Sequence, residues 1–553
     1  TITGHKAPGQ ESLAPQQTRI MGRLSYFLAW FGGCVSIGTF TMGSSVVGTL
    51  NLIQATLAIA IGCFVIGIAL ALNGAAGYKY GIPFMVQARS AFGFTGTRLP
   101  GLVRAVPAVV WYGFQSWIGA GALNMVSATL FGFDNLVFYF IAFQFLQIGL
   151  SVMGFQGIKW LENIGSAFIL ASLVYMFYST VQRYGDVLSA NLLTMEGSWG
   201  MPFWGATMLF LGIYSTMMLN VGDYAREHKR GSGPGLLTTL YAMSILPCTL
   251  FMGLIGFMVS EATGTSDPIQ VFANAVDNTS LLMTTLMFIA FAQVTTNVLN
   301  NVVPPTYVLM DAFKLRFRPA TMIVGLLAAV GTIFSGEEGD GGANPITAFL
   351  AIAGTLVLFG EALTNPSEIV ERVDSLPLTI VAALTFFAAT VGINLVANFI
   401  PPAYDRANLF PSRISFKVGG LITAVIAFFV GALWVAVISR IGVPGFVNAL
   451  GAIVAPFYGI ILVDYYLVRR QELDIQQLFS SAPGSAYYYD GGWNRRALIA
   501  FGGAALFSLS TVVVPALADL NGYGWMLGAA LGGLFYFGLM RSSMVPAATL
   551  QGR

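Results

Sequence analysis

The sequence VPAVVWYGFQSWIGAGA (Val106–Ala122) lies in a long apolar segment that contains no charged residue between Arg104 and Asp134. A segment of this length can cross a bilayer as a helix, which needs about 20 apolar residues. Trp111 and Gln115 are four residues apart, so on a helix they share one face, one turn apart. A ring and a carboxamide placed in this way predict a site at membrane depth for a small, planar, polar molecule.

The composition is that of a polytopic membrane protein. Of the 553 residues, 56% are hydrophobic and only 9% are charged, whereas a soluble chain has about 25% charged residues. The formal net charge is +2, from 26 Lys and Arg against 24 Asp and Glu, so no extended basic face for nucleic acid is predicted.

Cysteine and histidine usage indicates no metal site. Cys34, Cys63 and Cys248 lie in apolar segments without a CxxC spacing, which is typical of small core side chains. His5 and His228 lie outside the apolar segments. The sequence also contains no Walker-type motif, metal-ligand cluster or nucleophile constellation, so we expect neither an enzyme nor a bound cofactor other than a coupling ion.

Apolar stretches long enough to cross a bilayer occur about fifteen times, at helix-like lengths and without the alternation of a β-barrel. Residues 1–23 are polar and rich in Pro and Gly, without a signal-peptide core, and predict a weakly ordered cytoplasmic tail. Residues 24–541 form the predicted transmembrane domain, and 542–553 a C-terminal tail. The stretches are 24–49, 51–74, 102–131, 134–154, 160–181, 203–222, 234–259, 279–303, 320–335, 345–363, 377–400, 416–438, 446–467, 497–516 and 523–540.

Basic residues gather in alternate loops of the first eight stretches, which predicts a cytoplasmic location for these loops. The opposite loops 260–267 and 335–342 are acidic. After 314–318 the alternation fails, because 406–417 and 469–470 are basic but would lie outside. Either one later segment does not cross fully, or the charge rule fails there. The early basic loops contain Arg19 and Arg23, Lys79, Arg89, Arg98 and Arg104, Lys159, Arg226 to Arg230, and Lys314 to Arg318.

One helix pair is present twice. FAQVTTNVLNNVVPPTY (Phe291–Tyr307) is similar to FAATVGINLVANFIPPAY (Phe387–Tyr404), and both end in Asn-x-x-Pro-Pro-x-Tyr. We therefore predict a duplicated segment, 234–303 and 345–400. This direct repeat differs from the inverted repeats that transporters often contain.

The first stretch, WFGGCVSIGTFTMGSSVVG from Trp30, mixes glycines with hydroxyl side chains. Such a helix can break at mid-membrane, and the freed carbonyls can then coordinate a cation. The alternative is an unbroken helix whose small residues allow close packing.

The eighth stretch contains Thr295, Thr296, Asn297, Asn300 and Asn301 within an apolar run. Polar groups at this depth are costly unless they hydrogen-bond or bind a ligand. Hydroxyl and carbonyl oxygens without a carboxylate suit Na⁺. The alternative is hydrogen bonding between helices.

Tyr214 in the sixth stretch and Asp223 directly after it each have an interpretation that involves no ligand. Tyr214 lies mid-helix, where a tyrosine more often packs than binds a ligand. Asp223 precedes REHKR (226–230) and predicts an interfacial ion pair or a helix-end contact.

Several motifs resemble the nucleobase:cation symporter-1 family, and within it the allantoin and hydantoin permeases. The resemblance extends from about Arg19 to Ala500. The motifs are YGIPFMVQARSAFGFTG (80–96), VVWYGFQSWIGAGALN (109–124), LNVGDYAR (219–226), AQVTTNVLNNVVPP (292–305), LFPSRISFKVGGLI (409–422) and VDYYLVRRQELDIQQLF (463–479).

The resemblance implies an all-α, five-plus-five inverted-repeat bundle of the sodium-symporter type, here with the duplicated pair added to about twelve core helices. It also implies that Trp111 stacks on the substrate ring, that Gln115 hydrogen-bonds it, and that Asn301 binds its other edge. Ser36 and Tyr214 differ from the residues common in relatives, which indicates an altered substrate shape. The implied sodium ligands are the carbonyls of Gly32, Val35 and Ala292 and the hydroxyls of Thr295 and Thr296.

Two alternatives stay open for the ion site. The second copy of the repeat has Gly392 and Ile393 where the first has Thr295 and Thr296, which favours the first copy. The surroundings of the second copy are at least as similar to the family.

The sequence thus predicts a monomeric, multi-pass symporter of the plasma (inner) membrane. It would import allantoin, hydantoin, uracil, cytosine or a purine with a cation, which we expect to be Na⁺. The alternatives are a proton-coupled permease for another small heterocycle, such as a vitamin precursor, and a non-transporting membrane receptor.

Overall fold

The computed structural model describes residues 13–34, 38–152, 154–265 and 444–541, with a few single positions between 274 and 322. The described segments are helical, and they contain isolated β-bridges but no strand. The labelled elements are α2 (Arg23–Gly33), α3 (Gly38–Ser45), α4 (Leu52–Tyr80), α5 (Phe84–Gln87), α6 (Arg89–Phe92), α7 (Arg98–Phe131), α8 (Leu136–Val152), α9 (Gly154–Thr194), α10 (Met201–Gly212), α11 (Ser215–Asn220), α12 (Gly222–Ala225), α13 (Pro234–Thr263), η3 (Asp464–Val468), α23 (Ile475–Leu478), α24 (Arg495–Val513), η4 (Pro515–Leu520) and α25 (Gly524–Met540).

The long helices coincide with the predicted apolar stretches. Four described helices are long and apolar enough to cross a membrane: α4, α13, Pro444–Val468 and α24. Shorter apolar helices are Gly119–Phe131 at the end of α7, α10 and α25. The agreement follows from the hydrocarbon thickness, which sets the length of an apolar helix.

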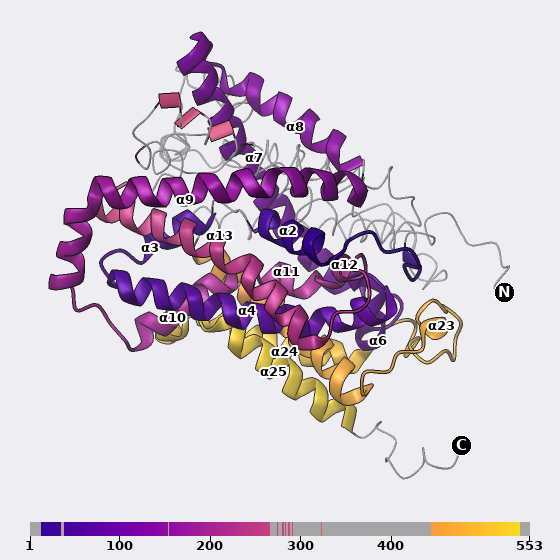
Figure 1. The fold of residues 1–553 in the computed structure, drawn as a ribbon. Helices are drawn as coiled ribbons and strands as arrows, with labels where there is room; N and C mark the ends of the chain where they lie inside the picture. Colours follow the sequence, from indigo (N-terminus) through magenta and orange to yellow (C-terminus); the bar gives the residue numbers. More distant parts are fainter. Residues whose placement is uncertain are drawn as a thin grey trace, which may run out of the picture.

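The helices form closely packed groups (Figure 1). Helix α13 packs along α4 and α3, and α4 also contacts α10 and α12. Helix α9 crosses α13 and α2, while α7 pairs with α8 and α24 with α25. The two parts of the first stretch and the three parts of the sixth thus lie around α4 and α13.

Backbones approach closely where α13 meets its neighbours, and this requires glycine. A Cβ atom on Gly43 would lie 1.9 Å from the carbonyl oxygen of Gly253, and one on Gly256 would lie 2.2 Å from that of Phe40. A Cβ atom on Gly67 would lie 2.7 Å from the Cβ of Ala242. Small residues at membrane helix interfaces allow this packing.

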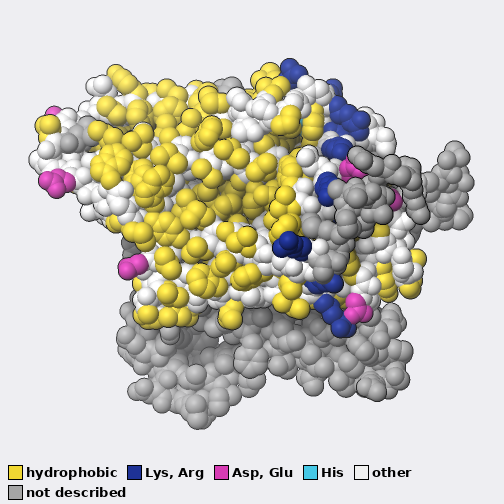
Figure 2. Space-filling view, turned by 90° about the horizontal axis from the view of Figure 1, so that it is seen from below, with side chains coloured by type: hydrophobic (Ala, Val, Ile, Leu, Met, Phe, Trp, Pro, Cys, Tyr) yellow, Lys and Arg dark blue, Asp and Glu magenta, His cyan; other side chains and the backbone are white. Residues whose placement is uncertain are grey.

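The outer surface identifies the lipid-facing side. Figure 2 shows a broad apolar face, with Lys and Arg side chains gathered toward one end. Large exposed apolar side chains include Phe64 (61%), Leu506 (76%) and Leu534 (66%). We call the end with the Lys and Arg side chains the basic end; the enrichment of basic residues on the cytoplasmic side predicts that it faces the cytoplasm.

Part of the N-terminal segment differs from the expected loose tail. The backbone N–H of Gln16 donates to Gly81 O (2.8 Å), and Arg226 donates to the carbonyl of Ala14 (3.0 Å). Met21 forms a parallel bridge with His228. Residues 13–22 therefore pack against the basic end of the helices. Residues 1–12, the C-terminal tail and most of the predicted duplicated segment lie outside the described residues.

Candidate functional site

The first stretch is described as two helices. Helix α2 ends at Gly33, Cys34 follows in a turn, and α3 begins at Gly38. Residues 35–37 lie outside the described residues. The two helices flank the glycine-rich part of the sequence, for which a break was one of two interpretations.

The sixth stretch is interrupted as well. Helix α10 ends at Gly212 and α11 begins at Ser215, with Ile213 and Tyr214 in the turn between them. The backbone N–H of Tyr214 bonds to the carbonyl three residues earlier, Leu211 (3.1 Å). A tighter turn of this kind inside a helix often marks a functional hinge.

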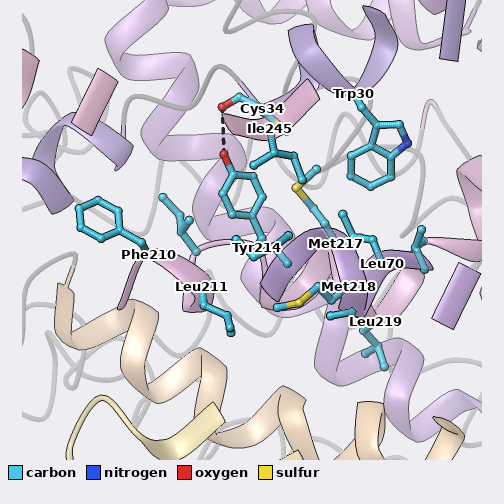
Figure 3. Close-up of a cluster of buried hydrophobic side chains, with 14 of the residues drawn as sticks. Trp30, Cys34, Leu70, Phe210, Leu211, Tyr214, Met217, Met218, Leu219 and Ile245 are labelled. Atoms are coloured by element: carbon cyan, nitrogen blue, oxygen red, sulfur yellow. Dashed lines mark hydrogen bonds between the residues drawn. The ribbon is translucent and has the colours of Figure 1, made fainter. Parts of the chain in front are cut away.

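Tyr214 connects the two interruptions to α13. Its hydroxyl donates to the carbonyl oxygen of Cys34 at 3.5 Å and shares a hydrogen bond with Thr249 Oγ1 at 2.6 Å. Figure 3 shows the ring pointing toward Cys34 from among buried apolar side chains. The thiol of Cys248 donates to Phe31 O (3.2 Å) in the last turn of α2. Tyr214 is thus buried and anchored, as the packing interpretation predicted.

The end of α2 provides electrostatics suited to a cation. Gly32 is buried in the last turn of this helix, where the helix dipole carries partial negative charge. The three cysteines, Cys34, Cys63 and Cys248, are buried free thiols, which confirms that they are core side chains. The polar groups described around Tyr214 are therefore neutral hydroxyl, carbonyl and thiol groups.

Helix α7 contains both residues of the predicted binding face. Gln115 is buried, with 4% of its surface exposed. Trp111 lies on the same continuous helix, but its side chain lies outside the described residues. The other predicted site residues also lie outside them: Val35, Ser36, Ala292, Thr295, Thr296 and Asn301.

A buried polar cluster that the sequence did not predict lies nearer the basic end of the helices. Arg104 was assigned to a basic loop, but the structure places it inside α7 with 1% of its surface exposed. Its Nε donates to the Asn220 carboxamide oxygen at 2.8 Å. Its position within the apolar stretch 102–131 is the one feature of the sequence that indicates burial of Arg104.

Asp223 adjoins this cluster. One of its oxygens accepts the backbone N–H of Phe84 (2.8 Å) at the first residue of α5, and the other accepts from the Asn220 amide (3.4 Å). The first N–H groups of a helix have no partner within the helix. The helix-end interpretation of Asp223 is therefore confirmed.

Comparison with known proteins identifies the family. A family model described as "Permease for cytosine/purines, uracil, thiamine, allantoin" matches residues 14–335 and 342–528. The chain belongs to this family. The predicted nucleobase:cation symporter-1 membership is confirmed, and so is the prediction that the chain is a multi-pass membrane transporter and not an enzyme.

Relatives match the permease over most of its length. An allantoin permease of Bacillus subtilis is 26% identical, covering 96% of this chain and 93% of the relative. A hydantoin permease of Microbacterium maritypicum is also 26% identical, covering 88% and 82%.

Solved structures confirm the inverted-repeat helical bundle. Mhp1, a nucleobase-cation-symport-1 family transporter in a closed conformation with bromovinylhydantoin bound, matches with a TM-score of 0.65 at 23% identity, covering 97% of this chain and 96% of that one. A Na⁺-coupled sialic acid symporter matches with a TM-score of 0.51 at 10% identity, covering 95% and 90%.

Outside the membrane spans, the permease has a buried histidine at its basic end. His228 stacks between Tyr26 (ring centroids 4.5 Å apart) and Tyr78 (5.5 Å). Its Nδ1 lies 3.2 Å from Met21 O, and its Nε2 lies 3.0 Å from Ser232 Oγ. A carbonyl only accepts, so Nδ1 carries the hydrogen. Burial lowers the pKa of His228 from its usual value, which keeps the ring neutral.

A cavity of about 980 Å³ opens at the basic end of the C-terminal helices of the permease. Its lining includes Arg469, Asp490 and Arg495. Arg469 pairs with the buried Asp464 (3.4 Å), and Arg495 pairs with Asp490 (2.6 Å). None of its lining residues comes from α2, α10, α11 or α13, so it is separate from the interrupted helices.

Proposed function

We propose that this permease imports a nucleobase-related heterocycle, of the allantoin and hydantoin type, by symport with Na⁺ across the plasma (inner) membrane. The match of the family model to nearly the whole chain is the observation that carries this proposal. The two relatives named as allantoin and hydantoin permeases support the substrate class. The named Na⁺-coupled symporter of the same fold supports the coupling ion.

In the proposed substrate site, Trp111 stacks on the heterocycle and Gln115 hydrogen-bonds its polar edge. Asn301 binds the opposite edge, and Ser36 and Tyr214 shape the wall. Gln115 is buried on α7, and Tyr214 is fixed by Thr249. Anchoring the tyrosine hydroxyl leaves its ring in one orientation, which suits an apolar wall more than a flexible contact.

The proposed ion site lies at the interruption of the first stretch. Carbonyls of Gly32, Val35 and Ala292 and the hydroxyls of Thr295 and Thr296 would hold Na⁺. The position of Gly32 at the end of α2 supports this assignment, since the negative end of a helix attracts a cation. Bound Na⁺ would stabilise the outward-open state, to which the substrate then binds.

Uptake into vesicles reconstituted with the permease tests this function. Radiolabelled allantoin is offered with and without Na⁺, and unlabelled uracil, cytosine, hydantoin and purines are added as competitors. We expect saturable uptake that requires Na⁺ and is blocked by one competitor class. Uptake driven by a proton gradient without Na⁺ would contradict the ion. Binding without uptake would contradict transport and favour a receptor.

Two sets of variants test the site. Trp111→Ala and Gln115→Ala should abolish substrate binding while the protein still expresses and folds. The double variant Thr295→Ala/Thr296→Ala should raise the Na⁺ concentration needed for half-maximal uptake. Unchanged uptake in the first set would contradict the substrate site, and unchanged Na⁺ dependence in the second would assign the ion to the second copy of the repeat.

A further inference from the structure

Arg104 is a buried guanidinium between two membrane helices. It lies on α7, with 1% of its surface exposed, and donates to Asn220 at the end of α11 at 2.8 Å. Burying a charge is costly unless it is paired and hydrogen-bonded. An arginine at this position therefore stabilises one particular arrangement of α7 and α11 and disfavours arrangements in which the contact is lost.

The contact continues into a network. The Asn220 amide also donates to Tyr224 Oη (3.2 Å) and to Asp223 (3.4 Å), whose second oxygen accepts the backbone N–H of Phe84 (2.8 Å). The Tyr224 ring meets the Trp30 ring edge-on at 5.4 Å. The network thus joins the first, third and sixth membrane stretches and the loop that follows the second.

The network lies between the proposed substrate site and the cytoplasm. Arg104 precedes Gln115 by 11 residues on α7, which corresponds to about 16 Å along the helix axis. Asn220 follows Tyr214 by six residues, or about 9 Å. Both displacements point toward the basic, cytoplasmic end. The Arg104–Asn220 pair therefore bridges α7 and α11 below the site.

We propose that Arg104 is a positioning residue of the cytoplasmic gate, and that its hydrogen bond to Asn220 holds the gate closed. Release of the substrate into the cytoplasm requires α7 and α11 to separate, which breaks this bond and hydrates the guanidinium. The proposal deepens the proposed transport function and rests on it. The gate has two states because the buried guanidinium either donates to Asn220 or is exposed to water.

The native cysteines provide a reporter that needs no substrate. Cys34 and Cys248 are fully buried beside Tyr214, on the far side of the network from the cytoplasm. In inside-out vesicles, a membrane-impermeant methanethiosulfonate reagent reaches these thiols from the cytoplasmic side only when the gate is open. Mass spectrometry then identifies the labelled cysteine and its labelling rate.

The test variants are Arg104→Gln and Asn220→Ala. Hydrogen bonds to charged groups are strong enough that the loss of one shifts an equilibrium about tenfold or more. We therefore expect both variants to increase the rate of cytoplasmic labelling of Cys34 by about tenfold, with less labelling in right-side-out vesicles. Arg495→Ala is the matched control, because Arg495 is a cytoplasmic arginine with 77% of its side chain exposed.

Two results would overturn the gate. One is an unchanged labelling rate in both variants, and the other is an equal increase in the Arg495→Ala control. If Arg104→Gln does not fold, Tyr224→Phe tests the same network by removing one hydroxyl, and we expect a smaller increase in labelling. No increase in a folded Tyr224→Phe protein would then count against the gate. Because labelling requires neither substrate nor Na⁺, the failure of the transport proposal is a separate result, seen only in the uptake experiment.

Discussion

The surroundings of Tyr214 and of Asn220, two positions along the sixth stretch, differ in their chemistry; we call them the Tyr214 level and the Asn220 level. Around Tyr214 the polar groups are neutral: a phenol hydroxyl meets Thr249 and a backbone carbonyl, and a thiol meets another carbonyl. Around Asn220, six residues further along the sixth stretch, a guanidinium and a carboxylate join the network. Only the second level links α7 to α11 through a described hydrogen bond.

This difference indicates two tasks. Neutral oxygens bind a small polar molecule or Na⁺ weakly enough to release it, and interrupted helices of this kind leave backbone groups near the proposed site. A buried network that contains charged groups is destabilised strongly when one partner is lost, because the remaining group stays buried without compensation. The level around Tyr214 is therefore suited to binding, and the level around Asn220 to holding one arrangement of helices.

The largest effect is expected from Asp223→Ala. This change leaves the Phe84 N–H without its acceptor and removes the carboxylate from the network around Arg104. Leaving a buried hydrogen-bonding group without its partner costs about 1–3 kcal/mol, and this change affects two such groups, the Phe84 N–H and the Asn220 amide. We expect a corresponding fall in the thermal unfolding midpoint of the purified protein in detergent.

Asp223→Asn is the control for this prediction. An asparagine oxygen can still accept the Phe84 N–H, but the negative charge is lost. We expect a smaller loss of stability than in Asp223→Ala. Equal losses in the two variants would show that the charge, and not the helix-end contact with α5, accounts for the stabilisation.

A smaller loss is expected at the level of the interrupted helices, from Gly43→Ala in α3. The new Cβ would lie 1.9 Å from the carbonyl oxygen of Gly253, and a backbone atom cannot move aside alone. Overpacking of this kind costs about 1–3 kcal/mol. Gly205→Ala in α10 is the matched control, because a Cβ there meets no atom within 4 Å. A melting temperature of Gly43→Ala at or above that of Gly205→Ala would contradict the close approach of α3 and α13.

The sequence predicted the helices well because membrane thickness fixes their length. The stretch 234–259 corresponds to α13 (Pro234–Thr263), and 523–540 to α25 (Gly524–Met540). The first and sixth stretches are each described in pieces on either side of Cys34 and Tyr214. The glycine and hydroxyl content of the first stretch allowed a break as one of two interpretations, whereas the sixth stretch carried no equivalent signal.

The polar contacts between distant segments could not be predicted. Arg104 and Asn220 are 116 residues apart, and no periodicity relates them. The sequence also treated Arg104 as one of several loop arginines, because charge counting does not separate a buried arginine from an exposed one. The packing of residues 13–22 could not be predicted for a similar reason: it depends on backbone bonds to Gly81, Glu227 and Lys229, which composition does not encode.

Tyr214→Phe separates the two tasks at the binding level. The change keeps the ring but removes the hydroxyl that bonds to Thr249 and Cys34. A hydrogen bond of this kind contributes about 1 kcal/mol to stability. We expect a small fall in the melting temperature with substrate affinity retained, since the ring forms the proposed wall. A loss of affinity as large as in Tyr214→Ala would instead assign the hydroxyl to direct substrate binding.

The smallest effect is expected from pH, through His228 beside the packed segment 13–22. Its pKa lies below the usual 6.5 because burial, with Arg19 and Arg23 nearby, disfavours the charged ring. The folded protein therefore prefers neutral His228, so this stabilisation is complete above about pH 6.5 and is lost as the pH falls through the lowered pKa. The neighbouring Glu227 carboxyl opposes this trend, since burial raises its pKa and its protonation favours the folded state.

Thermal unfolding between pH 8 and pH 5, compared in wild type and His228→Asn, isolates the contribution of the histidine because both proteins retain Glu227. We expect the wild type to lose more stability than the variant as the pH falls, and parallel profiles would assign the pH dependence to other groups.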